Sequence, residues 1–218
     1  MKIHPISCGL GFAFLIEVSH GLFLIDSGSP GQEQRVLAKM KALGRRDLKL
    51  IWITHAHYDH YGSADALRKL SGAAIGVHSA DAGGMIAGKS LLGTARRYGF
   101  IYPIVQKMLI QVHPLPATSP DFTCTGGETL EQYGLNASIL HTPGHTPGHT
   151  CVQLEERIVF AGDLLGQFPR PGLQRLLAIN WDQIPQSLAI LQSARPEWIY
   201  TGHSRYPLPG RALENFSG

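Results

Sequence analysis

The feature that most constrains the fold of this 218-residue chain is a group of polar residues placed where an apolar stretch ends. Leu48 to Ile53 has the composition of a buried strand, and the sequence continues Thr-His-Ala-His-Tyr-Asp-His up to residue 60. Alternate residues of an extended chain point to the same side, so His55 and His57 can bind one ion. Asp59 and His60 turn another way as the next helix begins, toward a second position. The fold must therefore bring this strand end close to further ligands.

Three later positions repeat this arrangement, since each places a possible ligand at the end of a predicted strand and beside glycine. They are His145 in Thr-Pro-Gly-His-Thr, Asp163 in Ala-Gly-Asp and His203 in Thr-Gly-His. Glycine lets the backbone turn sharply and come close to an ion. Together the seven residues supply about the number of ligands that two ions of four or five coordination need, once a shared carboxylate and a shared water are counted. Imidazole and carboxylate without thiolate suit zinc, iron or manganese, and zinc is favoured for hydrolysis.

The first third of the chain has the pattern of an α/β fold. Short alternating runs predict neighbouring antiparallel strands at residues 2–7, 13–18 and 22–26. Helical spacing is present at residues 32–43, with Gly44 where a C-terminal cap would fall, and again at residues 63–70. Residues 73–77 are typical of one more strand.

The last part of the chain repeats this pattern. It predicts strands at residues 128–132, 137–141, 150–154 and 158–160, a helix at 183–194 and a final strand at 198–200. Two halves that each run from several strands into a helix and a strand favour a two-sheet sandwich with helices outside. Between them, we interpret the glycine-interrupted, mixed basic and apolar stretch as a helical insertion or lid around residues 80–118. The alternative is that its Tyr, Phe and Met side chains only pack on the core.

Length and composition predict one domain over residues 1–218, because 44% of the residues are apolar and form a substantial core. The formal net charge is +3, but Lys and Arg are scattered and give little support for a nucleic-acid partner. Cys8, Cys124 and Cys151 lie far apart without zinc-finger spacing, which indicates a reducing compartment. The sequence contains neither a signal-peptide core nor a membrane-spanning window, so we expect a soluble, cytoplasmic protein without a membrane partner.

Five motifs resemble those of the metallo-β-lactamase superfamily and, within it, those of the glyoxalase II-type hydrolases. They are Leu24-Ile25-Asp26-Ser27-Gly28, His55-Ala56-His57-Tyr58-Asp59-His60, His141-Thr142-Pro143-Gly144-His145-Thr146, Phe160-Ala161-Gly162-Asp163 and Thr201-Gly202-His203. They follow the family's order and span nearly the whole chain. The resemblance implies an α+β fold of four layers, an αββα sandwich.

The resemblance also implies a role for each ligand. The first metal would be bound by His55, His57 and His145. The second metal would be bound by Asp59, His60 and His203. Asp163 would bridge both, and Asp26 would orient ligands by hydrogen bonding without touching metal.

The remaining histidines are expected to have ordinary structural roles. His149 repeats the Thr-Pro-Gly-His context of His145, and we expect it to be structural or to contact a ligand. No such context surrounds His4, His20, His78, His113 and His141.

The expected cofactor is a pair of zinc ions, with iron or manganese as alternatives. The expected reaction is hydrolysis of a small ester, thioester or lactone by a metal-bridging hydroxide, with Asp59 orienting the water or carrying its proton. True β-lactamases of the family usually lack the bridging aspartate, so antibiotics are a poor first guess. Glutathione-thioester hydrolases commonly carry a C-terminal extension, whereas about fifteen residues follow His203 here. That departure argues against glutathione as the carrier.

Two other classes remain open at this point: a mononuclear iron oxygenase similar to the persulfide dioxygenases of the superfamily, and a metal-binding module without catalysis. We expect a small-molecule substrate and leave a homodimer open. Residues that could contact the substrate are Arg96, Arg97, Tyr98, Tyr102 and Arg170, for each of which solvation at the surface is an equal alternative.

Overall fold

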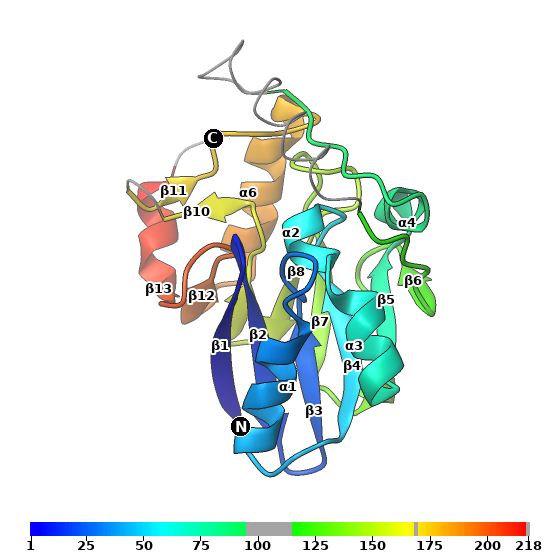
Figure 1. The fold of residues 1–218 in the computed structure, drawn as a ribbon. Helices are drawn as coiled ribbons and strands as arrows, with labels where there is room; N and C mark the ends of the chain where they lie inside the picture. Colours follow the sequence, from blue (N-terminus) through cyan, green and yellow to red (C-terminus); the bar gives the residue numbers. More distant parts are fainter. Residues whose placement is uncertain (95–114, 168–169, 217–218) are drawn as a thin grey trace.

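Two β-sheets packed face to face form the centre of the molecule (Figure 1). The structure is a computed structural model that describes residues 1–94, 115–167 and 170–216. The first sheet has the strand order β1-β2-β3-β4-β5-β6. Its strands are β1 (Lys2–Cys8), β2 (Gly11–Val18), β3 (Gly21–Ile25), β4 (Leu48–Ile53), β5 (Ala74–His78) and β6 (Phe122–Cys124). β1 to β3 pair antiparallel, whereas β3 to β6 are parallel.

The second sheet has the strand order β13-β12-β9-β8-β7. Its strands are β7 (Ala137–His141), β8 (Thr150–Leu154), β9 (Ile158–Phe160), β12 (Trp198–Tyr200) and β13 (Leu208–Pro209). β12 pairs parallel with β9, and the other neighbours are antiparallel. β10 (Leu165–Gly166) and β11 (Gly172–Leu173) pair separately.

Helices cover the outer faces of both sheets. Among the described residues, the α-helices are α1 (Glu33–Ala42), α2 (Tyr58–Tyr61), α3 (Ala64–Ser71), α4 (Ser79–Ile86) and α6 (Ile184–Ser193). The same residues include the short 3₁₀ helices η1 (Glu131–Tyr133), η2 (Trp181–Gln183) and η3 (Gly210–Asn215). Figure 1 shows α1 and α3 side by side in front of the first sheet, with α6 behind.

Alternate residues of β2 pack into different hydrophobic cores, so the first sheet is buried on both faces. Leu15 packs with Val36 of α1 and Leu67 of α3. Its neighbour Phe14 packs between the sheets with Phe160 of β9. A third core lies between the second sheet and α6. These three apolar layers separate four structural layers, helix, sheet, sheet and helix.

The predicted αββα sandwich is therefore confirmed, and most predicted elements lie within two residues of the observed ones. One prediction is wrong. Residues 128–132 are not a strand, because the Glu128 carboxylate accepts hydrogen bonds from the backbone N–H groups of Thr125 and Gly126 and closes a turn. These backbone donors lower the pKa of Glu128 to about 2. The strand of this region is β6, which precedes the turn.

The predicted insertion begins with helix α4, but residues 87–94 are not helical and reach an isolated β-bridge between Thr94 and Ala178. Its centre, residues 95–114, lies outside the described residues, as do the predicted substrate contacts Arg96, Arg97, Tyr98 and Tyr102 and the histidine at position 113. No helix in the described ranges combines the length and the apolar content that crossing a bilayer requires. All three cysteines are free and buried, and burial raises the pKa of each thiol.

Candidate metal centre

Loops at one end of the sandwich bring the seven predicted ligands together. His55 and His57 follow β4, and the extended backbone of His57 (φ −90°, ψ 145°) leads into α2, which carries Asp59 and His60. This change of direction separates the two pairs. The other three ligands follow strands of the second sheet: His145 after β7, Asp163 after β9 and His203 after β12. The ligand atoms form two groups, and within each group all lie within 4.8 Å of one another.

In the first group, three imidazole rings converge on one point. His57 Nδ1 lies 3.0 Å from His55 Nε2 and 2.9 Å from His145 Nε2, and the latter two atoms are 3.2 Å apart. Asp163 Oδ2 lies 3.6 Å from His145 Nε2. All three histidines are buried.

The outer hydrogen bonds of these rings determine which nitrogen carries the proton. His57 Nε2 donates to the Leu91 carbonyl (2.8 Å) and His145 Nδ1 to the Leu177 carbonyl (2.9 Å). The Thr54 hydroxyl donates to Asp26, so its oxygen accepts from His55 Nδ1 at 3.0 Å. A neutral imidazole has one N–H, so the three inward nitrogens all carry lone pairs. Three lone pairs that face one another repel, and a cation between them removes the repulsion.

In the second group, histidines face carboxylates. His203 Nε2 lies 3.0 Å from Asp163 Oδ2 and 3.8 Å from Asp59 Oδ2. His60 Nε2 lies 3.4 Å from Asp163 Oδ1. Among the described residues, these two buried atoms of His60 and Asp163 have no hydrogen-bond partner. Asp163 thus contacts members of both groups, and its unpaired oxygen fits a second ligand role better than a structural one.

Here too the outer nitrogens are held by protein acceptors. His60 Nδ1 donates to Asp26 Oδ2 (2.8 Å), and His203 Nδ1 donates to the Leu10 carbonyl (3.0 Å). Asp26 also accepts from the Thr54 backbone N–H at 2.8 Å. One aspartate therefore orients His60 directly and the start of the His55 loop indirectly, which is the role that the family resemblance implies for Asp26.

The two groups have opposite effects on protonation. Burial, followed by the neighbouring histidines, holds the pKa values of His55 and His145 well below the usual range. Burial also opposes protonation of His60, but Asp163 and Asp26 raise its pKa well above the usual range. Asp163 raises the pKa of His203 to about 9. Asp163 itself stays ionised, because His203 and His60 outweigh its burial and lower its pKa.

Asp81 is a buried residue of the centre that sequence reasoning missed. Its Oδ2 accepts from the Ala56 backbone N–H (2.8 Å) and the Thr146 hydroxyl (2.7 Å), and its Oδ1 accepts from the Gly148 backbone N–H (2.6 Å). It thereby fixes both loops that carry the first group. Nothing in the Ser-Ala-Asp sequence at the start of α4 distinguishes it from a surface aspartate.

His149 contacts a ligand without facing either group. Its Nδ1 donates to the Thr142 carbonyl (3.1 Å), so its Nε2 accepts from the Asp163 backbone N–H at 3.1 Å. A Cβ at Gly162 would lie 2.7 Å from this Nε2, so this position needs glycine. Burial lowers the pKa of His149 to about 3, which keeps it a neutral acceptor.

The two backbone carbonyls that accept hydrogen bonds from His57 and His145 belong to segments that pair with each other. Leu91, whose carbonyl holds His57, and Leu177, whose carbonyl holds His145, belong to two segments joined by the β-bridge between Thr94 and Ala178 (2.9 and 3.2 Å). Trp181 Nε1 donates to Thr94 Oγ1 at 3.1 Å. We call this the Thr94–Ala178 bridge.

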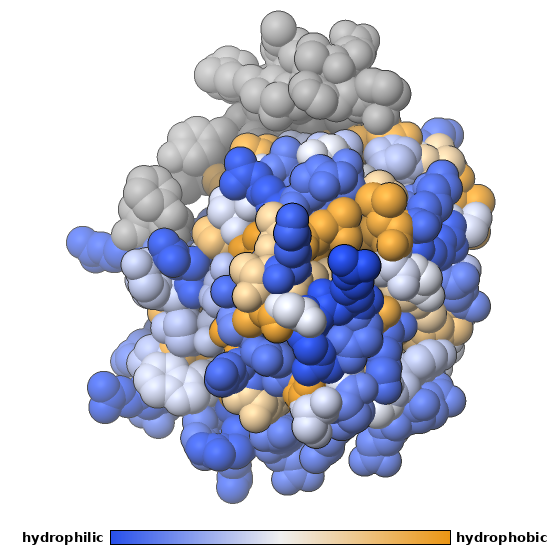
Figure 2. Space-filling model, turned by 60° about the horizontal axis from the view of Figure 1, so that its bottom comes forward, coloured by the Kyte–Doolittle hydropathy of each residue, from blue (hydrophilic) through white to orange (hydrophobic). Residues whose placement is uncertain are grey.

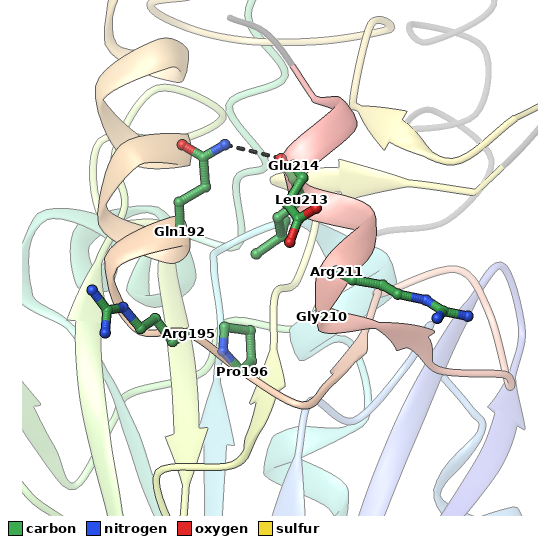
Figure 3. Close-up of a pocket in the computed structure, with 7 residues that line it drawn as sticks. All are labelled: Gln192, Arg195, Pro196, Gly210, Arg211, Leu213 and Glu214. Carbon is green, nitrogen blue, oxygen red and sulfur yellow. Dashed lines mark hydrogen bonds between the residues drawn. The ribbon is translucent and has the colours of Figure 1, made fainter.

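The histidines that were expected to be structural have partners outside the two groups. His4 bonds to Glu17, His20 to the Gly134 carbonyl, and His78 stacks on His141 with ring centroids 4.0 Å apart. Arg170 is exposed. A separate cavity of about 340 Å³ lies between the end of α6 and η3, where Gln192 donates to the Leu213 carbonyl (Figure 3). It includes none of the seven ligands.

Comparison with known proteins agrees with this geometry. The model of the family described as the metallo-beta-lactamase superfamily matches residues 6–203. The hydroxyacylglutathione hydrolase GloC of Haemophilus influenzae is 31% identical over 86% of this chain and 82% of that protein. A hydroxyacylglutathione hydrolase of Shewanella halifaxensis is 27% identical over 83% of this chain but only 55% of its own length. The solved BLEG-1 B3 metallo-beta-lactamase has a TM-score of 0.77 at 20% identity, covering 98% of this chain and 97% of that one, and shares the fold.

Proposed function

This chain belongs to the metallo-beta-lactamase superfamily, a family of metal-dependent enzymes, and from that premise we propose that it holds two zinc ions and hydrolyses a small thioester, ester or lactone. The hydrolase type and the cluster of histidine and aspartate ligands follow from the family and the geometry. The number of ions, their identity and the substrate are the proposal.

One observation carries this proposal: five imidazole nitrogens and the carboxylates of Asp59 and Asp163 converge in two adjacent groups. Each of the five rings donates its other N–H to a protein acceptor, which holds it in the tautomer that a metal needs. Nitrogen and oxygen donors of this kind suit zinc. When bound, two zinc ions would lower the pKa of a water molecule toward neutrality and polarise a substrate carbonyl.

The chain's own residues would then orient the reactants and move protons. Asp59 is about one-eighth exposed and reaches both His203 and solvent, so its carboxylate can accept a proton and release it to water. Asp26, Asp81 and His149 keep the ligands in place through the hydrogen bonds described above. His203, whose side chain is 43% exposed, lies on the open side.

The proposal is tested by titrating metal-free protein with zinc and assaying a panel of thioesters, aryl esters and lactones. We expect hydrolysis to rise with added zinc and to level off at two equivalents per chain. No hydrolysis of any member at full zinc loading would contradict it. Oxygen consumption by protein carrying one iron would instead support the oxygenase class.

A further inference from the structure

Two stacked histidines lie outside the metal centre, and the proposed function does not use them. The rings of His78, at the end of β5, and His141, at the end of β7, have centroids 4.0 Å apart and an interplanar angle of 15°. On the mainly hydrophilic face in Figure 2, polar residues meet solvent, whereas His78 is only 5% exposed. A buried ring that can titrate near neutral pH therefore needs a role of its own.

His78 caps helix α4 with one of its ring nitrogens. Its Nδ1 accepts from the Ala80 backbone N–H (3.2 Å), and its Nε2 donates to the Thr125 carbonyl (3.0 Å). Because the capping nitrogen must accept, the single proton of the neutral ring is on Nε2. A second proton, on Nδ1, would face the Ala80 N–H and break the cap. His78 therefore holds the start of α4 only while it is neutral.

The first turn of α4 carries Asp81, which connects this cap to the first metal group. Figure 1 shows α4 at the upper ends of β5 and β6. Asp81 accepts from the backbone N–H groups of Ala56 and Gly148, which lie in the two loops that carry the first group. A Cβ at Gly148 would lie 2.7 Å from the Asp81 backbone nitrogen, so this loop packs directly on the turn. A shift of the turn would therefore move both loops.

His141 connects the other side of the stack to the loop that carries His145. Its Nε2 donates to the Pro147 carbonyl at 2.9 Å. A Cβ at Gly126 would lie 2.6 Å from the His141 Cβ, so the turn after β6 closes against this residue. The stack thus lies between three segments, two of which also meet at Asp81.

The charged and titratable groups that face His78 come from these same segments. His141 opposes a second proton on His78, whereas Asp81 on α4 and Glu128 in the turn after β6 favour it. Burial has the largest effect, and it lowers the pKa of His78 from the ordinary value of 6.5. Because this pKa is lowered, the contribution of His78 to stability is present above pH 6.5 and is lost as the pH falls through the folded pKa.

We propose that His78 and His141 are positioning residues for the first metal group, and that acid weakens this group by breaking the cap on α4. The inference rests on the proposed metal-dependent function. A proton on His78 would release the Ala80 N–H and loosen the first turn of α4. Asp81 would then no longer fix the two loops that carry His55, His57 and His145.

Zinc binding at two pH values tests this inference. On the zinc-loaded protein, chelator competition at pH 7.5 and 5.5 measures the affinity of the more tightly held zinc, which we assign to the first group. Protonation of the ligands themselves is common to all variants, so a difference between variants isolates the effect of His78. We expect the affinity of the wild-type protein to fall about fivefold more than that of His78→Asn, because asparagine caps helices but takes up no proton. Equal falls would overturn the inference.

Matched variants separate this role from a general loss of structure. His78→Asn should keep the affinity at pH 7.5 within about twofold, whereas His78→Ala, which has no cap, should lose about fivefold. His141→Gln can still donate to the Pro147 carbonyl, so it should bind zinc more tightly than His141→Leu, by about threefold. His20→Asn, at an exposed histidine bonded to the Gly134 carbonyl, should behave as the wild type. Wild-type affinity of His78→Ala at pH 7.5 would overturn the positioning role.

Hydrogen exchange of the metal-free protein separates this inference from the proposed function. The protection factors of the Ala56 and Gly148 N–H groups should fall about fivefold from pH 7.5 to 5.5 in the wild type, but not in His78→Asn. Absence of zinc binding at both pH values would contradict the proposed function, and the exchange result would still decide the inference. Equal protection in the two proteins would overturn the inference and leave the metal centre in place.

Discussion

The two ligand groups of the metal centre are built differently. In the first group, buried histidines face one another, and burial lowers the pKa values of His55 and His145. In the second group, His60 and His203 face carboxylates that raise their pKa values, and His203 is partly exposed. Protons can therefore replace a cation in the second group but not in the first. We expect the first group to retain its metal longer against a chelator, and the second group to exchange metal and protons with solvent.

The largest effect should come from Asp163, because it is the residue that joins the two groups. Asp163→Ala should reduce the metal content by about one equivalent and lower kcat/KM by at least about 100-fold, since even residues that only orient ligands cost 10- to 100-fold. Elemental analysis and thioester assays measure the two effects. Asp47→Ala, at an exposed aspartate paired with Arg45, is the control. Full activity of the Asp163 variant would show that no shared ligand is needed.

Asp81→Asn should affect the first group selectively. The amide can no longer accept all three hydrogen bonds from Ala56, Thr146 and Gly148. We expect about 10- to 100-fold weaker binding of the first metal and a loss of about 2 kcal/mol in the free energy of unfolding. Chelator competition and urea unfolding measure these changes. An equal loss of binding affinity for both metals would show that the two ligand groups do not bind metal independently.

The stability of the metal-free protein should fall at both acid and alkaline pH, for two different histidines. The folded pKa of His149, near 3, is below its ordinary value of 6.5, so its contribution to stability is present above pH 6.5 and is lost as the pH falls toward 3. His203 behaves oppositely: its contribution is full below pH 6.5 and is lost as the pH rises through about 9. Urea unfolding from pH 4 to 10 should show both losses, and His203→Gln should remove part of the alkaline one. An unchanged alkaline slope in that variant would contradict the assignment.

The smallest effect should come from the Thr94–Ala178 bridge, which supports only the first group. Trp181→Phe removes the hydrogen bond to Thr94 Oγ1. It should weaken binding of the first metal by about threefold and leave binding of the second metal unchanged. Metal affinities from chelator competition would measure this. Trp198→Phe, at an exposed tryptophan of β12, is the matched control.

The sequence predicted which seven residues lie together in the candidate metal centre, because their signals are local. His55 to His60 are contiguous, and His145, Asp163 and His203 each stand beside glycine at a strand end. The αββα layers were also predictable, because strand and helix periodicities are strong in both halves.

The surrounding contacts could not be predicted, because they depend on the folded backbone. The acceptors for His57, His145 and His203 are backbone carbonyls, which any residue provides. Asp81 has no motif, and its importance comes from two loops far away in sequence. The strand predicted at residues 128–132 was wrong, because a carboxylate bonding its own preceding backbone can replace strand pairing.

The metal content of the protein, purified without a chelating tag, tests the central claim most directly. Elemental analysis should find two equivalents of zinc per chain. About one equivalent of iron would contradict the dinuclear hydrolase and favour an oxygenase, and no metal even after reconstitution would contradict the assignment of the seven ligands.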